Sequence, residues 1–182
     1  MAKNALPVFT RDQHTGSLKA LARGGSDDFE LVSDTAGSPY FRVLVADPNE
    51  ADRLATIWML DQAWPAGRNM LVECAADGAE ALEKIRRNQY ALLVLDWNMP
   101  KTAGADVLRT IRAGGPRVPV VVLAGQRREA IAPHLESLAA AFVHKDELDP
   151  CILSNAIASS ILLLDGAFGL ARAGYDTTRL SR

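Results

Sequence analysis

Residues 91 to 100 read Ala-Leu-Leu-Val-Leu-Asp-Trp-Asn-Met-Pro, an apolar run that stops at a carboxylate, Asp96. A short apolar run bounded by polar and turn residues is typical of a parallel strand that is buried on both faces. Comparable but weaker runs lie on both sides of it in the chain. We therefore expect five strands, at residues 43–46, 70–75, 91–95, 118–123 and 141–144.

The segments between these strands have apolar residues at helical spacing, for example Leu54 and Trp58. They predict helices from 51, from 78, from about 105, over 127–140 and over 150–164. Strands and helices thus alternate over about 120 residues, which predicts an α/β, doubly wound parallel sheet with helices on both faces. In such folds the ligand site lies beyond the carboxyl ends of the strands.

The bulk properties exclude several classes of protein. The chain has 182 residues, an apolar fraction of 48% and a formal net charge of -2. The charge gives no basic excess of the kind that nucleic-acid binding requires. Cys74 and Cys151 lie far apart and show no metal-site spacing, and there is no secretory signal or membrane-spanning run. We expect a soluble, cytoplasmic protein.

The chain divides into three predicted parts. Residues 1–39 are rich in turn residues and are expected to be a flexible N-terminal extension with at most a marginal helix near residues 18–22. Residues 40–165 form the folded domain, and residues 166–182 form a C-terminal tail. The run Leu162-Leu163-Leu164 either packs on the sheet or forms an exposed apolar patch for a partner or a homodimer. We expect no second folded domain, such as a DNA-binding helix-turn-helix, in the remaining length, which predicts either a stand-alone domain or a fragment of a larger protein.

Charged residues follow the first, third and fifth expected strands: Asp47, Asp96 and Lys145. Ala124 follows the fourth strand. Clustered carboxylates disfavour ionisation unless a cation compensates, and oxygen ligands suit Mg²⁺. With Mg²⁺ and a lysine ammonium to neutralise an incoming phosphoryl group, one carboxylate can act as the nucleophile on phosphorus. The strand ends therefore point to phosphoryl transfer to an aspartate.

Four blocks resemble the receiver domains of two-component response regulators, of the chemotaxis-regulator type, in order and spacing over about 120 residues. They are VLVADPNEADRL from Val43, ADGAEAL from Ala76, LVLDWNMP from Leu93 and FVHK from Phe142. The resemblance implies a flavodoxin-like sheet with strand order 2-1-3-4-5. It also implies a phosphorelay protein that accepts a phosphoryl group, and no enzyme beyond its own phosphotransfer and dephosphorylation.

The resemblance also implies the roles of individual residues. Asp96 is the phosphoacceptor, and Lys145 pairs with the phosphate. Asp47, Asp96 and the backbone carbonyl of Asn98 are the implied ligands of Mg²⁺. A histidine kinase or phosphotransfer protein and a downstream protein are the implied partners, with no nucleic acid.

The chain also departs from the family pattern. Receivers carry two adjacent acids after the first strand, and here either Pro48 or Ala46 stands in place of one, so Mg²⁺ should bind weakly. Ala124 replaces the hydroxyl residue of the switch, Phe142 stands at the aromatic switch position, and Ala103 replaces an aspartate. Two hypotheses follow: a receiver phosphorylated on Asp96 with altered output, or a phosphorylation-independent pseudo-receiver that acts as an interaction module.

Two other classes fit less well. A phosphatase-like hydrolase would need a second aspartate as its general acid, where this chain has Asn98. A nucleotide or flavin binder would need a glycine-rich or hydroxyl-rich loop after the first strand, where the acidic segment at residues 47–50 would repel phosphate.

Overall fold

A single sheet runs through the computed structural model, which describes residues 8–11, 18–21, 40–64, 69–114, 117–127, 129–131, 135 and 138–168. The sheet has seven strands in the order β2-β1-β4-β3-β5-β6-β7. The strands are β1 (Val8–Arg11), β2 (Leu18–Leu21), β3 (Tyr40–Ala46), β4 (Asn69–Ala75), β5 (Leu92–Asp96), β6 (Val120–Ala124) and β7 (Ala141–His144). The helices are α1 (Glu50–Ala63), α2 (Gly78–Arg87), α3 (Gly104–Gly114), η1 (Lys145–Glu147) and α5 (Pro150–Phe168).

The five strands from β3 to β7 are all parallel to one another. Numbered along the chain from β3, their order in the sheet is 2-1-3-4-5, so the expected fold is confirmed. The order reverses between β3 and β5, which pair side by side with Ala46 opposite Leu95. Because that reversal opens a crevice at the carboxyl ends, it places the ends of β3 and β5 at the expected ligand site.

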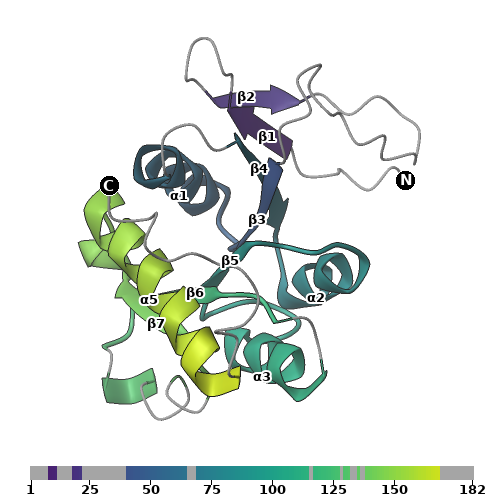
Figure 1. Cartoon of the computed structure of the whole chain (residues 1–182), viewed down its shortest axis with the longest axis vertical. Helices are drawn as coiled ribbons and strands as arrows, with labels where there is room; N and C mark the ends of the chain where they lie inside the picture. Colours follow the sequence, from purple (N-terminus) through teal and green to yellow (C-terminus); the bar gives the residue numbers. More distant parts are fainter. Residues whose placement is uncertain are drawn as a thin grey trace.

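Helices cover both faces of this sheet (Figure 1), with α1 and α5 on one face and α2 and α3 on the other. Every residue of β5 and of β6 is buried, which explains their unbroken apolar runs. On one face, Ile57 of α1 and Leu153 of α5 pack together in one core. On the other, Ile85 of α2 and Leu108 of α3 contribute to a second core.

The N-terminal segment differs from expectation. Residues 8–11 and 18–21 form an antiparallel hairpin whose first strand pairs with β4, with Phe9 opposite Val72 (Figure 1). The marginal helix expected near 18–22 is therefore wrong, and these two segments belong to the sheet. The physical reason is that β4 would otherwise be an edge strand with unpaired backbone groups, and a short hairpin satisfies them. The other residues of the stretch 1–39 lie outside the described residues.

The last helix is longer than expected and splits the leucine run. It continues through Gly166 to Phe168. One glycine in the interior of a helix costs only about 1 kcal/mol, so Gly166 does not end it. Leu164 is 3% exposed, whereas Leu162 is 59% and Leu163 is 44% exposed. The tail beyond residue 168 lies outside the described residues. In the part of the chain that is described, no helix is long and apolar enough to cross a membrane.

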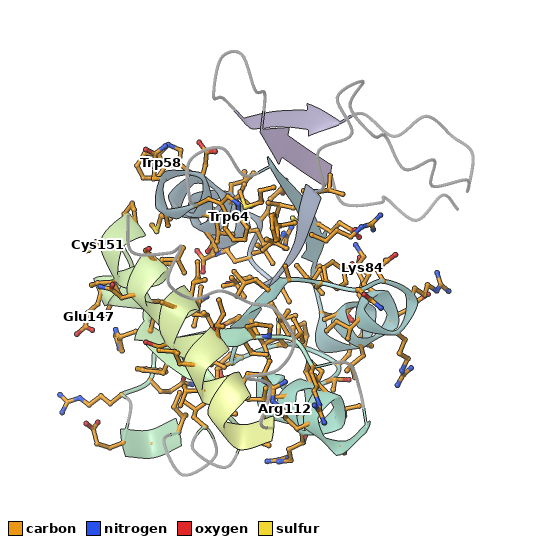
Figure 2. All side chains as sticks on the ribbon, viewed as in Figure 1. Trp58, Trp64, Lys84, Arg112, Glu147 and Cys151 are labelled. Carbon is orange, nitrogen blue, oxygen red and sulfur yellow. The ribbon has the colours of Figure 1, made fainter. Side chains whose placement is uncertain are left out.

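The helix expected over residues 127–140 is only partly described. Residues 129–131 and 135 are helical, 138 and 139 form a turn, and Pro133 lies outside the described residues. Arg112 of α3 ties this turn to the sheet, since its guanidinium donates to the carbonyls of Leu138, Ala139 and Val118 at 2.8–3.2 Å (Figure 2). Burial of the guanidinium lowers its pKa to about 10.

Candidate functional site

The ends of three strands bring Asp47, Asp96 and Lys145 together. The Nζ atom of Lys145 lies 2.7 Å from Oδ2 of Asp47 and 3.4 Å from Oδ1 of Asp96. Asp47 is 2% exposed and Asp96 is 4% exposed. Two buried carboxylates therefore meet one ammonium at the carboxyl edge of the sheet.

Lys145 also contacts Asp52 on the first turn of α1, at 2.9 Å between Nζ and Oδ2. Burial lowers the pKa of Lys145, but the hydrogen bonds to Asp47 and Asp52 and the charge of Asp96 outweigh it and raise the pKa well above its usual value. The ammonium therefore stays charged throughout the physiological pH range.

Asp96 is the least satisfied member of the group. Its Oδ1 atom is buried and, among the described residues, has no hydrogen-bond partner. The backbone N–H of Asn98 donates to the carboxylate, and Lys145 offsets part of its charge. Burial, together with the negative charge of Asp47, nevertheless raises the pKa of Asp96. An underbonded, electron-rich oxygen beside a cation is suited to attack an electrophile or to bind a metal ion.

The backbone around Asp47 is held at several points. Its N–H donates to the carbonyl of Ala75 at 3.1 Å, and Nη1 of Arg53 donates to its carbonyl at 2.6 Å. Its Oδ1 atom accepts the N–H of Asn49 at 2.8 Å. Asn49 in turn caps α1 by accepting the N–H of Ala51. The start of α1 thus fixes the carboxylate toward Lys145.

The loop after Asp96 is packed too tightly to allow side chains at two glycines. A Cβ atom at Gly104 would lie 2.6 Å from the carbonyl oxygen of Asp96 and 2.9 Å from Cα of Trp97. One at Gly78 would lie 2.0 Å from the carbonyl oxygen of Thr102. This close approach holds the loop, and Asn98 with it, against the start of α2 and of α3.

Comparison with known proteins agrees with this geometry. Residues 43–157 match the family model of the response regulator receiver domain. The chain belongs to this family. Receiver domains are signalling domains of two-component systems rather than typical enzymes.

Several relatives carry the name response regulator. The chain is 39% identical over 67 residues to the response regulator MprA of Mycobacterium leprae, and 34% identical over 97 residues to that of Mycobacterium ulcerans. These alignments cover 37% and 53% of this chain. They span only 28% and 39% of the relatives' own lengths.

Solved receiver structures are also similar. The signal receiver domain of NarL from Mycobacterium tuberculosis has 27% identity and a TM-score of 0.52, over 68% of this chain and 94% of that one. The Francisella 1452 receiver domain has 26% identity and a TM-score of 0.53, over 69% and 98%. A CheY-like receiver from Methanospirillum hungatei, at 21% identity, has a TM-score of 0.57 over 71% and 99%, and shows likeness of fold.

The structure describes both positions that the sequence analysis expects to be switch residues, Ala124 and Phe142. Ala124 ends β6 and is 0% exposed. Two residues on, Nε2 of Gln126 donates to Oδ1 of Asn98 at 3.0 Å, while its Oε1 atom is buried without a hydrogen-bond partner among the described residues. Phe142 on β7 is partly buried and packs against the core. Both switch assignments remain expectations.

The missing acid of the receiver pattern can be placed by burial. Ala46 is 1% exposed and belongs to the core on the α2 and α3 face, where a carboxylate would have no water. Pro48 is exposed and follows Asp47 directly. These facts favour the alignment in which Pro48 occupies the position of the second acid.

Asp52 was missed by the sequence analysis. It lies within a block that resembles receivers, but an acid in the first turn of a helix is ordinarily explained by the helix dipole. Its contact with Lys145 joins residues that are 93 positions apart. A local pattern carries no signal for such a contact.

The oxygen donors of Asp47 and Asp96 are of the kind that the Mg²⁺ implied by the family requires. The described residues include no group of three or more His, Cys, Asp or Glu side chains arranged to hold a metal ion. Two carboxylates, one with an unpartnered oxygen, remain at the site. An all-oxygen set of this kind fits a cation that retains several waters, as Mg²⁺ does.

Proposed function

We propose that this receiver acts in phosphorelay signalling by accepting a phosphoryl group on Asp96. The observation that carries the proposal is the buried Oδ1 atom of Asp96, which accepts no hydrogen bond from the described residues and lies 3.4 Å from the Lys145 ammonium. In the proposed step, a carboxylate oxygen of Asp96 attacks phosphorus and forms an O–P bond. The P–N bond of a phosphohistidine donor breaks, and the departing nitrogen takes the bonding electrons and a proton.

The roles of the neighbouring groups follow from charge. Lys145 would pair with the phosphoryl oxygens, because their negative charge would lie next to that of Asp47 and needs a cation to offset it. Asp47, Asp96 and the backbone carbonyl of Asn98 would hold Mg²⁺, which when bound supplies positive charge that neutralises the phosphoryl oxygens. The N–H of Asn98 already donates to the Asp96 carboxylate and orients it. Loss of the acid at Pro48 makes this metal site weak.

Intact mass tests the proposal directly. Incubation with phosphoramidate and Mg²⁺ should add the mass of one phosphoryl group, and Asp96→Asn should abolish the gain. The matched control is Asp106→Asn, because Asp106 is an exposed acid on α3 that pairs with Arg109. This variant should be phosphorylated normally. A wild-type protein that gains no mass would contradict the proposal.

That outcome would instead support the second candidate, a phosphorylation-independent pseudo-receiver. The observation in its favour is that Lys145 already holds two carboxylates at hydrogen-bond distance, while Ala124 has no hydroxyl to sense a phosphate. Such a domain would bind its partner equally in the presence and absence of phosphodonor.

The proposal also covers the bounds of the domain, its cellular location and its partners. We place the receiver at residues 40–165, in the cytoplasm, with a histidine kinase or phosphotransfer protein upstream and a protein partner downstream. Exposed apolar residues support partner binding: Trp58 projects from α1 with 59% exposure (Figure 2), and Leu162 is exposed on α5. Because this chain spans well under half of its curated relatives' lengths, activities of those whole proteins stay outside the proposal.

A further inference from the structure

Asp52 is a third carboxylate on the ammonium of Lys145 and has no role in the proposed function so far. Its Oδ2 atom lies 2.9 Å from Nζ, closer than the 3.4 Å that separates Nζ from Asp96. The Asp52 side chain is 40% exposed, whereas that of Lys145 is 25% exposed. The contact joins the first turn of α1 to the segment after β7.

We propose that Asp52 is a positioning residue, which holds the Lys145 ammonium and must share it with a phosphoryl group on Asp96. The inference rests on the proposed function and goes beyond it, because it assigns a brake on the phosphorylated state to a residue of α1. In a protein with Pro48 at the second acidic position, Asp52 is the acid that keeps a second carboxylate on Lys145.

One ammonium serves several negatively charged groups at this site. A lysine has three N–H donors. Asp47 and Asp52 accept at hydrogen-bond distance, and the Oδ1 atom of Asp96 is left without a hydrogen bond. A phosphoryl group on Asp96 brings additional charged oxygens to the same cation, so that each negative neighbour weakens the hold of Lys145 on the others.

The size of this effect is limited by exposure. Because Asp52 is partly solvated, its competition should be that of a surface ion pair rather than a buried one, which corresponds to about a threefold change in an equilibrium constant. Asp52→Asn keeps the shape of the side chain and removes its charge. It should strengthen binding of beryllofluoride, a phosphoryl analogue, about threefold in the presence of Mg²⁺.

Two further variants separate this contact from general charge. Asp52→Glu restores the carboxylate and should bind beryllofluoride as the wild type does. Glu50→Gln removes an equal charge from the same first helical turn, at an exposed residue two positions before Asp52, and should also behave as wild type. Equal strengthening in Glu50→Gln and Asp52→Asn, or no strengthening in Asp52→Asn, would overturn the proposal.

A phosphate-free measurement keeps the test independent of the proposed function. The ¹⁵Nζ resonance of Lys145 should shift, and its ammonium protons should exchange faster, in Asp52→Asn but not in Glu50→Gln. If no variant bound beryllofluoride or gained phosphoryl mass, phosphorylation would be refuted, and the lysine resonance alone would decide whether Asp52 holds Lys145. An unchanged resonance in Asp52→Asn would overturn the assignment.

Discussion

Replacing Asp96 by asparagine should make the folded protein more stable, although it removes the proposed phosphoacceptor. The Asp96 carboxylate is 4% exposed and its Oδ1 atom has no hydrogen-bond partner among the described residues. An unsatisfied buried polar group costs about 1–3 kcal/mol, and more when charged. Lys145, at 3.4 Å, offsets part of this cost. An uncharged amide removes the repulsion from Asp47, so the free energy of unfolding should rise by about 1–2 kcal/mol at neutral pH.

The pH dependence of this gain follows from the pKa of Asp96, which burial and the charge of Asp47 raise in the folded state. Below the ordinary aspartate pKa of about 3.9, Asp96 is protonated in both states and costs nothing. As the pH rises through that value and then through the folded-state pKa, the unfolded state ionises first, and the folded wild type loses stability. The stability advantage of Asp96→Asn should therefore be larger at pH 7 than at pH 4, and it should disappear as the pH falls further below the ordinary aspartate pKa of about 3.9.

Urea unfolding at both pH values, in EDTA to keep divalent cations away, measures this difference. In thermal unfolding, the melting temperature of the variant at pH 7 should rise by about 2–8 °C, because 1 kcal/mol shifts it by about 2–4 °C in a chain of this size. Glu83→Gln, at an exposed acid of α2 that pairs with Arg87, changes the net charge equally and should shift stability by less than about 0.5 kcal/mol. A less stable Asp96→Asn protein at pH 7, or an equal gain at pH 4, would refute the reasoning.

Three other substitutions test parts of the site. Pro48→Asp restores the missing acid and should tighten Mg²⁺ binding about tenfold by calorimetry, whereas Pro48→Asn should not; equal affinities would move the missing acid to another position. Gly104→Ala should cost about 2–4 kcal/mol in urea unfolding because its Cβ meets backbone, while Gly125→Ala, with nothing within 4 Å, should be tolerated. Ala124→Thr should enlarge the phosphodonor-dependent change in amide exchange after β6, which should be small in the wild type; strong protection there in the wild type would contradict this.

Local patterns were sufficient for the parallel sheet. The segment 141–144 is a strand with the expected bounds, and β5 is shifted by one residue so that Asp96 is its last residue. Buried parallel strands are apolar throughout, so that their positions are visible in the sequence without knowledge of their neighbours. Helix ends were less accurate, since α5 extends past the expected end to Phe168.

Pairings between distant segments could not be obtained in this way. The hairpin strand at 8–11 is short, and its pairing with β4 joins Phe9 to Val72. The contact of Asp52 with Lys145 has the same character, because it depends on α1 and β7 meeting at one edge of the sheet. The periodicity of a segment does not indicate which distant segment it contacts. For this reason residues 8–11 were expected to be flexible, and Asp52 was given no role.

If Ala124 occupies the switch position, as the sequence analysis expects, a phosphoryl group on Asp96 would have to act first through other contacts. Its oxygens would meet two existing contacts: the N–H of Asn98, which now donates to the carboxylate, and the ammonium of Lys145. Asn98 is bonded through its side chain to Gln126, after β6, and Lys145 is bonded to Asp52, on α1. Any differential stabilisation of two states must come from changes in these contacts, because a ligand shifts an equilibrium only through interactions that differ between the states. The bond between Gln126 and Asn98 joins two neutral amides, whereas the one on Lys145 joins opposite charges that respond directly to added negative charge. If Asp96 is phosphorylated as proposed, we therefore expect α1, rather than the loop after β6, to respond first.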